Sequence, residues 1–174
     1  TLWRTAAFAQ PRAALISIQT MVNEDIEFRS PAEIRAFQED LLRRALDYLA
    51  THSPFYRRMF AREGIDVQTI RTIDDLQRLP FTEKRDLQLH NADFLCCPPS
   101  AVIDYVTTSG TLGGPVTFAC TDADLERLAF NEAKSFACAG VDRNSIVQLM
   151  TTLDKRFMAG MAYYLGARRL RMGV

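Results

Sequence analysis

This sequence has few histidines, no net charge and no long apolar run, and each of these features argues against a class of function. Only two of the 174 residues are histidine, His52 and His90, so we expect no metal site or catalytic triad. Basic and acidic residues both number 21, which gives zero net charge and no electrostatic footprint for nucleic acid or an acidic membrane. No stretch approaches the ~18 uninterrupted apolar residues of a membrane span. We therefore expect neither nucleic acid nor a membrane as a partner.

Cysteine is also sparse, and its spacing matches no zinc motif. The four are Cys96, Cys97, Cys120 and Cys138, the first two adjacent. This pattern favours four thiols in a reducing cytoplasm, with a strained vicinal disulfide as the alternative. We expect Cys138, beside Phe136 on a helix, to be packed.

The first part of the chain is rich in helix signals. We interpret residues 1–26 as an extension or expression scar, poorly ordered and outside the fold argument. Ser30-Pro31 predicts a helix start, and apolar residues then recur at three- and four-residue steps as far as Leu49. Ser53-Pro54 predicts a second helix that Gly64 ends, and Thr82 is placed to cap a third. Residues 27–97 therefore read as a helical N-terminal region.

From residue 98 onward the pattern changes to alternating strands and helices. Strands are predicted at Ala101–Val106, Pro115–Cys120 and Ser145–Met150. Helices are predicted from a Thr121–Asp124 cap to about Ala139, ended by Gly140, and over Phe157–Leu165, ended by Gly166. The fold class is thus α/β: a helical region packed on the start of an α/β layered, nucleotide-binding domain, residues 98–174, that is incomplete.

The segment Thr107–Pro115, TTSGTLGGP, has the composition of a phosphate-binding loop. Its glycines let the backbone present N–H groups to an anion, its hydroxyls can donate to phosphate oxygens, and it contains no acid. It is not a Walker A loop, because Gly113-Gly114 precedes proline, and the glycine spacing does not fit a dinucleotide fingerprint. A flexible Gly/Thr hairpin connection is the structural alternative.

The same string resembles the phosphate-binding signature of the acyl- and aryl-CoA synthetase superfamily of adenylate-forming enzymes. Within it the chain resembles the phenylacetate–CoA ligase family, from about Glu27 to Val174. Two further boxes carry the likeness, Pro-Phe-Tyr-Arg at Pro54–Arg57 and IDDLQRLPFTEKRDL at Ile73–Leu87. By this resemblance the chain is an N-terminal fragment that covers less than half of such an enzyme.

The resemblance implies an AMP-forming carboxylate–CoA ligase. A small-molecule carboxylate, aryl or similar, attacks the α-phosphate of ATP with Mg²⁺, and coenzyme A then displaces AMP. The family's catalytic residues would lie beyond this chain, so we expect the fragment to be inactive alone. The residues implied to hold phosphate are Thr108, Ser109, Gly110, Thr111 and Gly113, and Phe157 matches a phenylalanine beside the acyl pocket.

Two residues depart from the family pattern. Leu112 replaces a usual hydroxyl residue and Gly114 a frequent lysine, so one neutral and one charged donor to phosphate are missing. The alternatives are an acyl-protein or capsule-type adenylating homologue, and a degenerate, truncated homologue that acts as a binding module. The acid, the acceptor and the oligomeric state stay open, a homodimer among the options.

Overall fold

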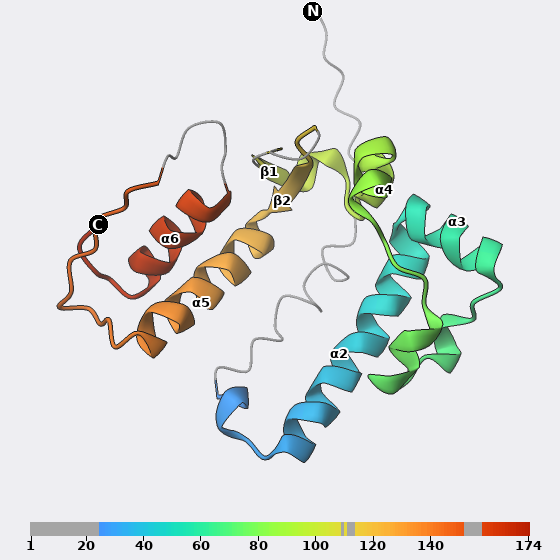
Figure 1. Cartoon of the computed structure of the whole chain (residues 1–174), viewed down its shortest axis with the longest axis horizontal. Helices are drawn as coiled ribbons and strands as arrows, with labels where there is room; N and C mark the ends of the chain where they lie inside the picture. The colour runs from blue at the N-terminus through green and yellow to red at the C-terminus, as the bar shows by residue number, and fades with distance from the viewer. Residues whose placement is uncertain (1–24, 109, 111–113, 152–157) are drawn as a thin grey trace, which may run out of the picture.

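The computed structural model describes residues 25–108, 110, 114–151 and 158–174. Figure 1 shows two groups of helices, one containing α2, α3 and α4 and the other α5 and α6, that meet at a β-hairpin. None of the described helices is both long and apolar enough to cross a membrane. The elements in chain order are η1 Ile26–Phe28, α2 Pro31–His52, α3 Pro54–Glu63, η2 Val67–Thr69, η3 Asp74–Arg78, α4 Lys84–Leu89, η4 Asn91–Phe94, η5 Pro99–Ala101, β1 Val102–Thr107, β2 Thr117–Thr121, α5 Asp122–Cys138 and α6 Met158–Arg169.

The first two long helices begin where their caps predict. Ser30 Oγ accepts from the Glu33 N–H while the Glu33 carboxylate accepts from the Ser30 N–H at 2.9 Å, a reciprocal capping box. Gly64 ends α3 in the left-handed region at φ 64°, which confirms its predicted role. The core of this group is made of large apolar side chains from α2, α3 and the segment after η2: Leu46, Met59, Phe60 and Ile70.

A buried seam joins α3 to η4. The Phe55 ring stacks on Phe94 at 4.1 Å between centroids, and the Tyr56 ring meets Phe94 edge-on. Ser53 is fully buried, caps α3, and donates its hydroxyl to the carbonyl of Asp93 at 3.0 Å. The box at residues 54–57 is therefore structural, because its rings fix α3 against the segment that follows α4.

The predicted cap of α4 is displaced by one residue. Asp86 Oδ2 accepts from the Glu83 N–H at 2.9 Å, so the helix is capped at Glu83 and not at Thr82. Thr82 Oγ1 instead lies 3.2 Å from Tyr56 Oη. The prediction of Thr82 as the cap was wrong because a contact with α3 engages its hydroxyl.

The hairpin and the helix after it confirm their predicted positions within two residues. β1 and β2 pair antiparallel, with Thr107 opposite Thr117, and Val106 is completely buried. Thr121 ends β2 and also caps α5, since the Asp124 carboxylate accepts from its N–H at 2.8 Å and its hydroxyl at 2.7 Å. The strand therefore passes directly into the helix without a linker.

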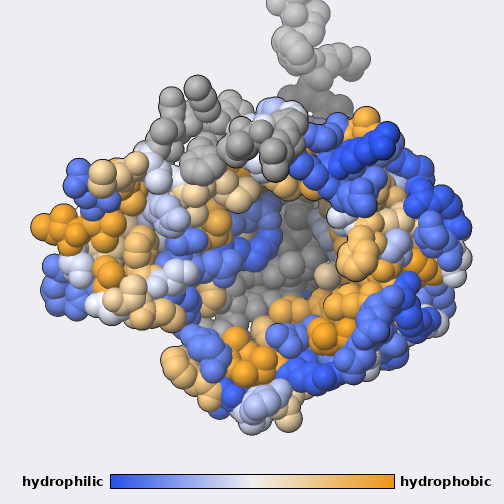
Figure 2. Space-filling model, viewed as in Figure 1, coloured by the Kyte–Doolittle hydropathy of each residue, from blue (hydrophilic) through white to orange (hydrophobic). Residues whose placement is uncertain are grey.

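The predicted strand at Ser145–Met150 is reduced to one parallel bridge between Ile146 and Gly173. Ile146 and Met150 are 88% and 87% exposed. Hydrophobic residues accordingly colour the edge of the molecule in Figure 2 where Figure 1 places this segment. An apolar run becomes a strand only where neighbouring strands pair with it, and within the described residues a single bridge is all that it finds.

Gly166 does not end the last helix as predicted, because it lies inside α6 against α5. A Cβ added to it would fall 2.4 Å from the Cβ of Glu132 and 3.0 Å from the Glu132 carbonyl carbon. The helix ends instead at Arg169, and Arg171, two residues further on, takes the left-handed conformation at φ 57°. Gly166 lies close to Glu132 and Ala133 of α5. The buried residues of the two helices are small: Ala129 and Ala133 on α5, and Gly160, Ala162, Gly166 and Ala167 on α6.

Gly166→Ala should lower the melting temperature of the chain. The added methyl overlaps backbone and side-chain atoms of Glu132, and such overpacking costs about 1–3 kcal/mol, against which the better helix propensity of alanine returns about 1 kcal/mol. Thermal unfolding followed by circular dichroism measures the difference. Gly114→Ala is the control, because its Cβ would meet only Gln88 Nε2 at an ordinary 3.7 Å. A melting temperature for Gly166→Ala at or above the parent value would contradict this packing.

Candidate functional site

The base of the predicted phosphate loop is closed by two hydrogen bonds. The Thr108 N–H donates to the Val116 carbonyl at 3.0 Å, and the Val116 N–H donates to Thr108 Oγ1 at 3.0 Å. The second bond uses the hydroxyl as an acceptor, so the hydroxyl proton takes no part in it. Between these limbs Gly110 has φ 68°, a conformation that glycine adopts without strain. Thr108 and Val116 thus hold the two limbs of a short loop together at its neck.

Only part of the predicted phosphate set can be placed. Thr108 lies at the neck and Gly110 just beyond it. Ser109, Thr111 and Gly113 lie outside the described residues, as do Leu112 and Phe157. The structure adds a role for Thr108 that sequence reasoning missed, since its hydroxyl closes the loop.

Two amide side chains from the helical group reach the downstream limb of the loop. Gln88 Nε2 donates to the Gly114 carbonyl at 2.7 Å, and Asn91 Nδ2 donates to the Thr117 carbonyl at 2.8 Å. Gln88 lies on α4 and Asn91 begins η4, three residues further on. Both contacts span 26 residues of sequence, so no local pattern signals them.

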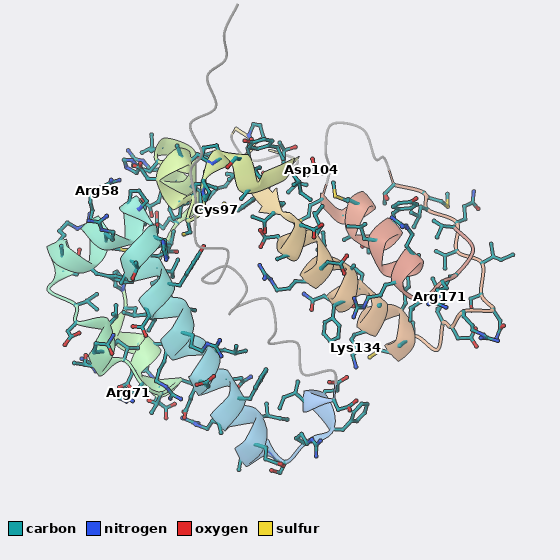
Figure 3. The ribbon with its side chains drawn as sticks, turned by 180° about the vertical axis from the view of Figure 1, so that it is seen from behind. Arg58, Arg71, Cys97, Asp104, Lys134 and Arg171 are labelled. Carbon is teal, nitrogen blue, oxygen red and sulfur yellow. The ribbon has the colours of Figure 1, made fainter. Side chains whose placement is uncertain are left out.

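A cavity of about 430 Å³ lies behind the hairpin, between α2, η4 and the start of α5. Part of its wall is formed by aromatic and cysteine side chains: Tyr48, Phe94, Cys96, Cys97, Tyr105 and Phe118. Figure 3 places Cys97 at this junction of the two groups. Tyr48 Oη donates to the Cys96 carbonyl at 3.0 Å, which holds that wall together. The volume is within the range of small-molecule sites.

All four cysteines are free thiols, as the sequence interpretation expects. Burial raises the pKa of Cys96, Cys97 and Cys120, so these groups are held in the protonated form. Cys138 is exposed, which overturns the prediction that it packs against its helix neighbours. It lies at the last residue of α5, away from the α6 contact.

Known proteins of similar sequence are phenylacetate–coenzyme A ligases, although no protein-family model matches the chain. The enzyme of Thermus thermophilus is 33% identical over 155 residues, which is 88% of this chain and 35% of that ligase. The Escherichia coli enzyme is 29% identical over 148 residues, 84% of this chain and 34% of that ligase. The chain is homologous to the phenylacetate–CoA ligases. It spans about a third of the length of these curated relatives.

Solved structures of another CoA ligase share the fold. An open conformation of 2-hydroxyisobutyryl-CoA ligase with 2-HIB-AMP and CoA superposes with a TM-score of 0.77 at 26% identity, over 86% of this chain and 35% of that one. The thioesterification state of the same ligase gives 0.78 at 27% identity, over 86% and 32%. The helical region, hairpin and following helices thus correspond to the N-terminal part of a CoA ligase, as the sequence resemblance implies.

The described residues contain no group of three or more His, Cys, Asp or Glu side chains placed to hold a metal ion. Mg²⁺ characteristically binds through substrate phosphates and few protein carboxylates.

Thiol labelling should separate Cys138 from the other three. Cys138 is exposed, while burial both shields the remaining thiols and raises their pKa. With a limiting amount of iodoacetamide near pH 8, we expect peptide mass spectrometry to find Cys138 modified first and Cys96, Cys97 and Cys120 only after denaturation or long exposure. Cys138→Ser should remove the fast phase and leave the slow one. Fast labelling of Cys96 or Cys97 in the native chain would contradict the packing of the cavity wall.

Proposed function

We propose that this chain forms the phosphate-binding part of an ATP-dependent, AMP-forming carboxylate–CoA ligase. The observation that carries the proposal is the neck of the loop, where Thr108 and Val116 exchange two hydrogen bonds and the Thr108 hydroxyl enters its bond as the acceptor. The homology to named CoA ligases supplies the reaction class. We further propose a cytoplasmic protein that acts on a small aryl or similar carboxylate.

In this reaction a carboxylate oxygen of the substrate attacks the α-phosphorus of ATP, and the bond from that phosphorus to pyrophosphate breaks. Negative charge gathers on the leaving pyrophosphate. Donors fixed in advance stabilise such charge better than donors that must reorganise during the step. We assign this task to Thr108, Ser109, Gly110, Thr111 and Gly113, with Mg²⁺ entering on the nucleotide. Coenzyme A sulfur then attacks the acyl carbon and AMP leaves.

Phe157 is proposed to lie beside the acyl group, as its counterpart does in the family that the sequence resembles. The acceptor could equally be a protein or a capsule precursor, because this segment holds no feature that selects it. A degenerate homologue that only binds is the other candidate, and Leu112 and Gly114 are the residues that favour it.

ATP–pyrophosphate exchange by the protein in its native length tests the adenylation step. We expect exchange to depend on one class of acid in a panel of aryl and alkyl carboxylates, and to fall when Thr108 is changed to valine, which keeps the shape and removes both functions of the hydroxyl. Thr108→Ser, which retains the hydroxyl, is the matched control. No exchange with any acid, together with no effect of Mg-ATP on the melting temperature, would remove the enzyme hypothesis and leave the binding module.

Gly114→Lys should strengthen phosphate binding. The position is exposed, and a Cβ there meets only Gln88 Nε2 at 3.7 Å, so the backbone tolerates a side chain. A lysine adds a charge-assisted contact, which at an exposed site should tighten binding of Mg-pyrophosphate about three- to tenfold at low salt. Isothermal titration calorimetry at low and high ionic strength measures the gain in affinity for Mg-pyrophosphate and the expected loss of that gain at high salt. Gly114→Ala makes the same backbone change without the charge, and an equal gain from alanine would show that charge is not the cause.

A further inference from the structure

The loop is held from the helical group as well as from its own neck. Gln88 and Asn91 each place one amide N–H₂ on a backbone carbonyl of the downstream limb, at 2.7 and 2.8 Å. They are three residues apart across the α4–η4 junction, and both reach the same limb of the loop. Their targets, Gly114 and Thr117, flank the buried Val116 whose N–H closes the neck. Hydrogen bonds at Gly114, Val116 and Thr117 thus fix this limb.

The two carbonyls matter to an anion because a carbonyl oxygen carries partial negative charge. A limb free to rotate could turn either oxygen toward a phosphate and repel it. A hydrogen bond from an amide side chain satisfies the oxygen and fixes the direction in which it points. The amide is neutral and donates through a fixed planar group, so it orients the peptide without adding a charge that would compete for the ligand.

We propose that Gln88 and Asn91 are positioning residues for the phosphate loop: they engage the Gly114 and Thr117 carbonyls, hold the downstream limb, and so fix the neck from which the loop meets phosphate. The holding role stands on the described contacts. The consequence for phosphate rests on the function proposed above.

Through these two contacts the helical group supports the loop. The contacts continue back into the core of that group. Asp93, two residues after Asn91, accepts the hydroxyl of buried Ser53 and pairs with Arg58 at 2.6 Å. Phe94, the next residue, stacks on Phe55. Asn91 therefore extends from a segment that α3 already holds rigidly.

Hydrogen exchange at two backbone amides tests the holding role in the full 174-residue chain without any ligand. The Thr108 and Val116 N–H groups are the reporters, since both take part in closing the neck. Gln88→Ala and Asn91→Ala should each speed their exchange about three- to fivefold, and the double variant tenfold or more. Gln88→Glu has the same shape but offers a carboxylate to a carbonyl, so it should be at least as disruptive as alanine.

The matched controls are Gln38→Ala on α2 and Asn131→Ala on α5, which remove the same amides from exposed helix positions. Melting temperatures of all variants should stay close to the parent, so that faster exchange reports the loop and not global unfolding. Exchange at Thr108 and Val116 equal to that of the controls overturns the proposal. So does a Gln88→Glu variant that behaves like the parent, because only the shape of the side chain would then matter.

Titration with Mg-pyrophosphate separates this proposal from the function itself. If the parent chain binds it, the dissociation constant should rise by about the same factor as the exchange rate in each variant, and an unchanged constant beside faster exchange overturns the positioning role. If the parent chain does not bind it, the phosphate function fails, while the exchange data still decide whether the two amides hold the limb.

Discussion

The arrangement of this chain depends on the seam between α3 and η4. Ser53 is buried completely, and its single hydroxyl both accepts from the Tyr56 N–H and donates to the Asp93 carbonyl. A buried hydroxyl without partners is costly, so the two bonds fix where α3 begins and where η4 lies in one step. The stacked rings of Phe55 and Phe94 exclude water around them. Gln88 and Asn91 of the α4–η4 segment contact the hairpin loop, so the position of the loop depends on this seam.

A second constraint acts from the other side of the hairpin. Thr121 is both the last residue of β2 and the cap of α5, so the direction of the strand determines the direction of the helix. Close packing of small residues then holds α6 on α5. Phe130 strengthens the group, because its ring lies under the cations of Lys134 and Arg169 at 5.5 and 5.4 Å. Lys134 also pairs with Glu27 at 2.6 Å, a contact that ties α5 to the segment before α2 (Figure 3).

Features determined by residues three or four apart could be predicted from the sequence. The caps at Ser30, Ser53 and Thr121 and the glycine end of α3 are of this kind, because donor and acceptor belong to one turn of the chain. Features that depend on a distant neighbour could not. Gly166 looks like a helix terminator by itself, and only the proximity of Glu132 shows that it is a packing residue. Thr82 likewise loses its predicted role to a tyrosine that lies 26 residues away.

The candidate site divides along the same line. Its composition was readable, since glycines and hydroxyls without acids already suggest an anion. The side chains that hold the loop could not be predicted, because in the sequence Gln88 and Asn91 resemble any exposed amides and only the fold brings them to the loop. This division bears on the two departures from the family pattern. Leu112 and Gly114 remove donors from the loop itself, whereas the neck at Thr108 and the amides on the downstream limb belong to the support. Under the proposed function, the departures would weaken the contacts that the loop itself makes with phosphate, while the hydrogen bonds that hold the loop in place remain.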